Sequence, residues 1–247
     1  MIPQNIYMVG IGGIGMSALA QMLIESGRAV SGSDREESPT TLLLQKKGIV
    51  VVSGHHIMNV ADDCELLIYS DAVHTDNPER MRADELNIPQ LSYFEALGMI
   101  SKGMRTIAVA GTHGKTTTTG MLTKVLQAAG KEPTAIVGSI VRDFESNFLP
   151  GSEDLLVVEA CEYRDHLLKL SPEILVITNL ELDHTDYFPD IESLIEAFSG
   201  RSQGARTRIH RDRSRIAKHG TGTRWCSSAY CRLHSRTCAT ARTNRRV

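Results

Sequence analysis

Two glycine-rich turns in the sequence have the residue types that bind phosphate groups. The first, residues 10–15 (GIGGIG), fits the pattern G-x-G-x-x-G directly after a short apolar run. Glycines allow a tight turn and a close approach of backbone N–H groups to phosphate. Asp34 ends the next predicted strand, where an acid would meet a ribose hydroxyl. A nucleotide-phosphate site is predicted, with a ligand-free turn or a dehydrogenase's nicotinamide dinucleotide site as alternatives.

The second turn, residues 111–116 (GTHGKT), follows an apolar run and precedes a predicted helix. Gly-Lys-Thr in this context is typical of a phosphate-binding loop, in which backbone N–H groups surround the phosphates. The Lys115 ammonium would contact the β- and γ-phosphates, and the Thr116 hydroxyl would reach Mg²⁺. The full motif has glycine where this chain has Val109, so the turn is a variant.

Acidic and polar residues follow two further apolar runs. Glu159 comes after residues 155–158, and Asn179, Asp183 and His184 come after residues 174–178. The carboxyl ends of parallel strands meet at one edge of a sheet, where ligands bind. We therefore expect Thr116, Glu159 and His184 to gather around one site, although a strand-terminal Glu or a lone His is often only structural.

Strand and helix patterns alternate twice along the chain, which predicts an α/β protein with parallel sheets covered by helices. A boundary near residues 100–105 would separate a Rossmann-like domain (1–100) from the first part of a phosphate-loop ATPase domain (101–200). The predicted strands cover 6–9, 28–34, 49–52, 66–70, 106–110, 134–137, 155–158 and 174–178. The predicted helices cover 16–26, 40–47, 79–86, 91–97 and 116–129.

Composition indicates a globular protein. The chain has 247 residues, of which 41% are hydrophobic and 23% are charged. No apolar run approaches the length of a membrane-spanning helix, and the first residues do not resemble a signal peptide. The five cysteines are unevenly spread, so a disulfide framework is not expected. These features predict a cytoplasmic protein without membrane partners.

Residues 201–247 differ sharply from the rest. They hold 13 Lys and Arg against one acidic residue, whereas residues 1–200 hold 14 against 28. A predicted amphipathic helix is interrupted at about residue 200. A shifted reading frame explains this best, and it implies a disordered segment. The alternative is a basic arm that binds nucleic acid or an acidic surface, and the Cys and His spacing does not match a usual zinc site.

Taken together, the motifs resemble those of the Mur ligases, ATP-dependent enzymes that form amide bonds in peptidoglycan synthesis. The resemblance covers about residues 4–199 and is nearest to members that add L-alanine to UDP-N-acetylmuramate. It rests on segments 10–17 (GIGGIGMS), 31–34 (SGSD), 54–56 (GHH), 70–73 (SDAV), 77–79 (NPE), 110–118 (AGTHGKTTT), 159–162 (EACE) and 178–184 (TNLELDH).

The resemblance implies a role for each motif. The first turn would bind the diphosphate of a UDP-sugar through Gly12, Gly13, Ile14, Gly15 and Met16, with Asp34, Ser70 and Ala72 nearby. The second turn would bind ATP through Gly111, Thr112, His113, Gly114, Lys115, Thr116 and Thr117. Thr116, Glu159 and His184 would hold Mg²⁺, and Lys115 and His184 would be catalytic. The muramyl carboxylate would become an acyl phosphate, which the amine of alanine would then attack.

The chain also departs from the family pattern. The family has three domains, and nothing in residues 201–247 corresponds to the later segments that contact adenine or to the third domain. We therefore expect the 247-residue chain to be inactive or nearly so, because catalysis depends on precise alignment. A ligase that joins a recycled murein peptide to the same sugar nucleotide and, less well supported, a NAD-dependent oxidoreductase remain alternatives. Nucleic-acid binding is not expected, and the sequence does not indicate an oligomeric state.

Overall fold

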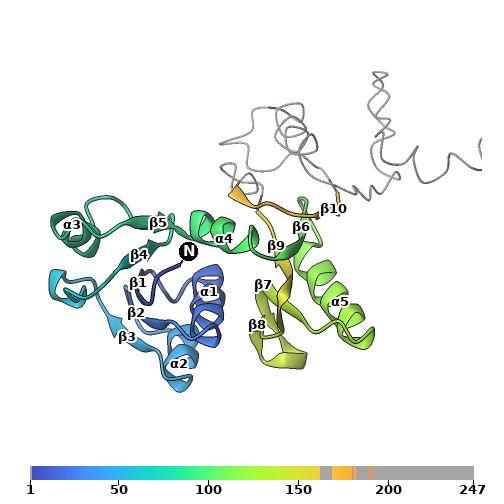
Figure 1. Ribbon diagram of the computed structural model, residues 1–247, viewed down its shortest axis with the longest axis horizontal. Coiled ribbons are helices and arrows are strands. Elements are labelled where there is room, and N and C mark those ends of the chain that lie inside the picture. The colour runs from blue at the N-terminus through green and yellow to red at the C-terminus, as the bar shows by residue number, and fades with distance from the viewer. Residues whose placement is uncertain (1, 162–168, 180, 182–189, 191–247) are drawn as a thin grey trace, which may run out of the picture.

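The computed structural model describes residues 2–161, 169–179, 181 and 190. These residues form two five-stranded sheets (Figure 1). Asp183, His184 and the basic segment 201–247 lie outside the described residues.

The first sheet is entirely parallel, as the sequence predicts, with strand order β3-β2-β1-β4-β5. Its strands are β1 (Asn5–Val9), β2 (Ala29–Asp34), β3 (Val50–Ser53), β4 (Leu66–Tyr69) and β5 (Gln90–Ser92). The helices between and after them are α1 (Ile14–Glu25), α2 (Pro39–Lys46), the 3₁₀ turn η1 (Ile57–Asn59), α3 (Pro78–Glu85) and α4 (Tyr93–Ser101).

Polar side chains set where three of these helices begin. The Ser38 hydroxyl accepts a hydrogen bond from the N–H of Thr41 at the start of α2. Asn77 caps α3 in the same way, and Ser92 forms a reciprocal capping box with Glu95 at the start of α4. These side chains satisfy backbone donors that have no partner within a helix.

Both faces of the first sheet are covered, and the alternation along β1 shows how. Ile6 and Met8 belong to a core cluster with residues of α1 and α4. Tyr7 and Val9 point to the opposite face and pack in a second cluster with Ala83 of α3. Successive strand residues point to opposite sides, so a strand buried on both faces is apolar throughout.

The second sheet has the order β10-β6-β9-β7-β8. Its strands are β6 (Arg105–Ala110), β7 (Pro133–Val141), β8 (Ser146–Leu149), β9 (Ser152–Glu159) and β10 (Ile174–Ile177). Helix α5 (Lys115–Ala128) connects β6 to β7, and the 3₁₀ turn η2 (Arg142–Phe144) connects β7 to β8. β8 pairs antiparallel with β7, so this sheet is mixed, whereas the sequence predicts only parallel strands.

The two sheets share one core. The cluster that contains Met8 and Leu19 also contains Ile136 of β7 and Phe148 of β8. Helix α1 packs against β7 and β8, and Figure 1 shows it facing them. Among the described residues, no helix is long and apolar enough to cross a membrane, and Cys64 and Cys161 carry free thiols.

Candidate functional site

The first glycine turn follows β1, the strand at which the order of the first sheet reverses. Ligands of open α/β sheets bind outside the strand ends at such a point. The turn is fixed from β2: the Ser33 carbonyl accepts the N–H groups of Gly10 and Ile11 at 2.8 and 3.0 Å. The Asp34 carboxylate accepts the N–H of Gly12 at 2.7 Å. Asp34 therefore shapes the turn in this structure.

The N–H groups of Ile14, Gly15 and Met16 lie in the first turn of α1. These N–H groups have no carbonyl partner within the helix, because the carbonyl that each would bond to lies four residues earlier, before α1 begins. Together with the helix dipole they form the positive end of α1, which favours an anion at the first glycine turn. The Gly13 N–H is used locally, bonding to the Gly10 carbonyl at 3.2 Å.

The segment after β4 lies directly beside the first turn. Gly10 has a φ of 77°, and a Cβ placed on it would lie 3.0 Å from the Cβ of Ser70. The Ala72 N–H lies 3.5 Å from the Ser70 hydroxyl. The structure thus places Ser70 beside Gly10, with Ala72 two residues further along the same segment. The role that the family resemblance implies for these two residues stays a prediction.

The buried carboxylate of Glu79 links several residues next to this edge of the sheet. Glu79, at the start of α3, has no exposed surface. Its oxygens accept hydrogen bonds from the hydroxyls of Tyr7 and Ser33 at 3.0 and 2.6 Å, and from the Asn59 amide at 2.7 Å. The Nδ1 atom of His55 lies 2.9 Å from the same carboxylate. Burial, followed by the Glu79 charge, raises the pKa of Tyr7 above its ordinary range.

The second glycine turn joins a strand to a helix in the second sheet, as the first turn does in the first sheet. It lies between β6 and α5, and Gly114, with a φ of 78°, is the residue before α5. Lys115, Thr116 and Thr117 therefore form the first turn of α5, where N–H groups have no partner within the helix. The Lys115 ammonium donates to the carbonyl of Thr112 at 3.2 Å and to that of Gly111, so it folds back over the loop.

Residues after β10 hold the second turn in place. The Asn179 side chain accepts the His113 N–H at 2.9 Å and donates to the His113 carbonyl at 3.2 Å. Gly111 lies so close that a Cβ on it would be 2.4 Å from the Thr178 hydroxyl. Thr112 exchanges hydrogen bonds with the backbone of Glu181. Val109 is fully buried within β6, and the tight turn begins at Gly111.

Thr116 and Glu159 meet, as the sequence predicts. The Thr116 hydroxyl donates to Glu159 Oε1 at 3.0 Å, and the N–H of Gly138 in β7 donates to Oε2 at 2.7 Å. A hydroxyl and a carboxylate beside a phosphate loop are the hard oxygen ligands that Mg²⁺ prefers, so the residues present fit that ion. Within the described part of the chain, no three His, Cys, Asp or Glu side chains cluster as a metal site. The third predicted ligand, His184, lies outside it.

Tyr93, the first residue of α4, packs against the first glycine turn. A Cβ on Gly15 would lie 2.8 Å from the Tyr93 ring, so the first turn of α1 packs directly on this side chain. Burial, and then the charge of Glu159, raise the pKa of Tyr93 above its ordinary range.

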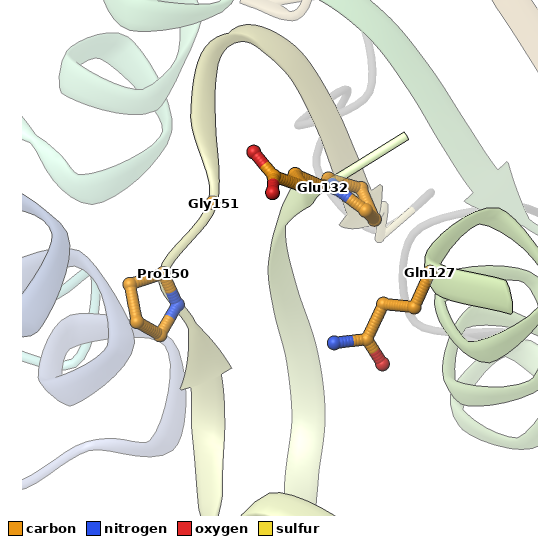
Figure 2. Close-up of a pocket in the computed structure, with 5 residues that line it drawn as sticks. Gln127, Glu132, Pro150 and Gly151 are labelled. Atoms are coloured by element: carbon orange, nitrogen blue, oxygen red, sulfur yellow. The ribbon is translucent and has the colours of Figure 1, made fainter. Parts of the chain in front are cut away.

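A surface hollow of about 490 Å³ lies elsewhere (Figure 2). It is lined by Gln127 at the end of α5, by Glu132 and Pro133 before and at the start of β7, and by Pro150 and Gly151 before β9. The hollow lies beside the amino ends of the parallel strands β7 and β9, whereas the glycine turn of this sheet follows the carboxyl end of β6. The hollow is therefore separate from the candidate site.

Sequence reasoning missed the residues that support the two turns. Glu79, His55 and Asn59 have no assigned role, although segments 54–56 and 77–79 stand out as motifs. Gln21 of α1 and Asn147 of β8, both buried, are also missed. A Gln four residues after Ser17 on an otherwise apolar helix face is a usable indication that this face meets another polar group.

Comparison with known proteins relates the two sheets to one family. Residues 5–105 match the family model described as "Mur ligase family, catalytic domain", and residues 109–200 match the "Mur ligase middle domain". The UDP-N-acetylmuramate–L-alanine ligase of Caldicellulosiruptor saccharolyticus is 47% identical over 193 residues, which are 78% of this chain and 42% of the relative. That of Rubrobacter xylanophilus is 44% identical over 195 residues, 79% of this chain and 43% of the relative.

Two solved structures have similar folds. UDP-N-acetylmuramate-alanine ligase MurC from Thermotoga maritima superposes with a TM-score of 0.75 at 35% identity, covering 84% of this chain and 49% of that one. The UDP-N-acetylmuramate:L-alanyl-γ-D-glutamyl-meso-diaminopimelate ligase of Neisseria meningitides gives a TM-score of 0.73 at 28% identity, with coverage of 81% and 68%.

The chain thus spans about 42% of the length of the curated relatives it matches. The two matched family segments together cover more than half of the chain, and each contains one glycine turn. The first holds the whole of the first sheet, and the second begins within β6 and holds the rest of the second sheet. The chain therefore belongs to the Mur ligase family.

Proposed function

We propose that this chain carries the two phosphate-binding sites of a ligase that uses ATP to join L-alanine to UDP-N-acetylmuramate in peptidoglycan synthesis. The observation that carries the proposal is the pairing of two glycine turns, each opening a helix, on two adjoining sheets. The names of the relatives that are 42–47% identical support the choice of substrates.

In this proposal the first turn binds the UDP diphosphate. The N–H groups of Ile14, Gly15 and Met16 donate to phosphate oxygens, while Asp34 holds Gly12 and leaves those groups facing outward. Ser70 and Ala72 line the adjoining segment. Residues 1–100 form the sugar-nucleotide domain, and residues 101–200 contribute to the ATP domain.

The second turn binds the triphosphate of ATP. The N–H groups of Gly114 to Thr117 surround the β- and γ-phosphates, and the Lys115 ammonium moves from the loop carbonyls to the phosphate oxygens as charge develops there. Thr116 and Glu159 hold Mg²⁺, which neutralises phosphate charge when bound. The residues of this chain therefore act by positioning and by charge stabilisation as the phosphoryl group passes to the muramyl carboxylate.

A second candidate is a ligase that joins a murein peptide to the same sugar nucleotide. The similarity to the Neisseria structure, which has that type of name, supports it. The higher identity to the alanine ligases favours the amino acid as the acceptor. A NAD-dependent oxidoreductase would use the first turn and leave Lys115, Thr116 and Glu159 without a role, so we place it last.

Binding measurements on the 247-residue chain test the proposal. Isothermal titration calorimetry with UDP-N-acetylmuramate, with Mg-ATP and with NADH should give heat for the first two ligands only. Adding EDTA should weaken ATP binding and leave UDP-N-acetylmuramate binding unchanged. Binding of NADH without UDP-N-acetylmuramate would contradict the proposal and favour the oxidoreductase.

A further inference from the structure

The start of α1 is held by residues of the second sheet. Ser17 and Gln21 lie four positions apart on one face of α1, and both are buried, with 0% and 2% of their surface exposed. Residues at this spacing share a helix face. That face packs against Ser146 and Asn147 of β8, which are also buried. Figure 1 shows α1 facing β8.

The Asn147 amide has a hydrogen-bond partner for each of its polar atoms. Its Nδ2 donates to the carbonyl of Ile14 and, at 3.0 Å, to the Ser17 hydroxyl. Its Oδ1 accepts from the Gln21 amide at 3.1 Å, and Gln21 Oε1 accepts from the Ser146 hydroxyl at 3.0 Å. A buried network with every member satisfied fixes one relative arrangement of the elements that contribute to it.

Ile14 is the first residue of α1 and part of the first glycine turn. Asn147 lies in a strand of the second sheet and therefore bonds directly to the backbone of the first glycine turn. Tyr93 supports the next residue, since its ring lies against Gly15. Asn147 and Tyr93 thus both contact the first turn of α1, which carries the N–H groups of Ile14, Gly15 and Met16.

The same strand pair also contacts the second site. β8 pairs with β7, in register Ile136 with Phe148, and the Gly138 N–H of β7 holds the Glu159 carboxylate at 2.7 Å. Hydrogen bonds from α1 to β8, from β8 to β7 and from β7 to Glu159 thus connect Ile14 to Glu159. We propose that Asn147 is a positioning residue that fixes the first glycine turn relative to the phosphate loop, and so prepares the diphosphate site for binding. This inference rests on the proposed function.

The test compares Asn147→Leu with Ser146→Ala. The first substitution keeps the side-chain volume and removes the bonds to α1. The second breaks the far end of the same network and leaves the Ile14 contact in place. Calorimetry with UDP-N-acetylmuramate should show an affinity about tenfold weaker for Asn147→Leu and within about twofold of the parent for Ser146→Ala. Mg-ATP affinity should be unchanged in both.

Amide hydrogen exchange gives a readout that needs no ligand. The Ser17 N–H bonds to the Gly13 carbonyl at 2.8 Å, and its exchange should be faster in Asn147→Leu, whereas exchange in β4 should not change. If Asn147→Leu fails to fold, Asn147→Ala, which leaves room for water, replaces it and should show the same selective loss.

The outcomes separate the two proposals. Equal UDP-N-acetylmuramate affinity in the parent and in the Asn147 variant would overturn the positioning role and leave the proposed function standing. Equal loss of both ligands with a lowered melting temperature would show that Asn147 is merely structural and would also overturn it. A parent chain that binds Mg-ATP but not UDP-N-acetylmuramate would overturn the assignment of the first turn, and this inference with it.

Discussion

The Asp34 carboxylate accepts the backbone N–H of Gly12 at 2.7 Å, which ties the end of β2 to the turn after β1. A Cβ on Gly12 would lie 2.8 Å from the same carboxylate oxygen and 2.8 Å from the Thr41 methyl group. The contact therefore requires glycine at this position and makes Asp34 a structural part of the turn.

Replacing Gly12 by Ala should distort the first turn without unfolding the protein. We expect UDP-N-acetylmuramate affinity to fall about tenfold or more, because the N–H groups at the start of α1 lose their alignment. Gly120→Ala is the control, since a Cβ there meets no atom within 4 Å. Calorimetry that gives both variants the same affinity would contradict the expectation.

Replacing Lys115 by Met should weaken Mg-ATP binding about tenfold or more, because a charge-assisted contact with phosphate is lost while the alkyl chain stays. Lys124→Met is the matched control on the same helix, where Lys124 pairs with Asp143 at 3.1 Å on the surface. UDP-N-acetylmuramate binding should not change in either variant. Equal ATP affinity in both variants would show that Lys115 does not contribute to ATP binding.

Adding a methyl group at Gly138 should disturb the second site through Glu159. A Cβ there would lie 2.6 Å from the Glu159 carboxyl group and displace it from Thr116. We expect the Mg²⁺ concentration needed for half-maximal ATP binding to rise several-fold. Gly103→Ala, whose Cβ would be 3.6 Å from its nearest neighbour, should leave that value unchanged. An unaltered Mg²⁺ dependence in Gly138→Ala would exclude Glu159 as a ligand.

Much of this architecture could be predicted from the sequence because short segments of neighbouring residues indicate it. Apolar runs mark β1, β4, β6 and β9, and a glycine turn after a strand marks each candidate phosphate site. β8 could not be predicted in this way. Two of its four residues, Ser146 and Asn147, are polar, and they are buried only because α1 supplies their hydrogen-bond partners.

The Glu79 network is missed for a related reason. Tyr7 and Glu79 are 72 positions apart, and nothing in either local segment indicates that the carboxylate is buried. Polar residues near a turn usually indicate solvent exposure. Here the sheet brings Tyr7, Ser33 and His55 to one point, and the carboxylate is tolerated because every neighbour donates to it or pairs with it.

Removing the Glu79 carboxylate should therefore destabilise the protein strongly. Glu79→Ala removes the acceptor of the buried Tyr7 hydroxyl and breaks the bonds that Ser33 and Asn59 donate to the same carboxylate, so we expect a loss of about 3 kcal/mol or more in the free energy of unfolding. Glu79→Gln, which keeps one acceptor oxygen, should lose less. Glu85→Ala, on the exposed end of α3, is the control for denaturant unfolding. Equal midpoints for Glu79→Ala and Glu85→Ala would contradict the role of the network.

The protein should lose stability at alkaline pH because Tyr7 keeps its proton more tightly in the folded state than in the unfolded state. Its pKa is raised in the folded state, first by burial and then by the charge of Glu79. In the unfolded chain the phenol loses its proton near its ordinary pKa of 10.0, whereas in the folded chain the proton is held. Above pH 10 the unfolded state therefore binds fewer protons than the folded state. The stability that is fully present below pH 10 is lost as the pH rises further.

Phenylalanine at position 7 cannot ionise and should remove this part of the pH dependence. At pH 8 Tyr7→Phe should melt at a lower temperature than the parent, because Glu79 loses one donor. Between pH 10 and pH 11 the parent should lose stability faster, so the two melting temperatures should converge. Melting curves that stay parallel across this range would show that Tyr7 does not link stability to pH, and that the phenol reaches solvent in the folded state.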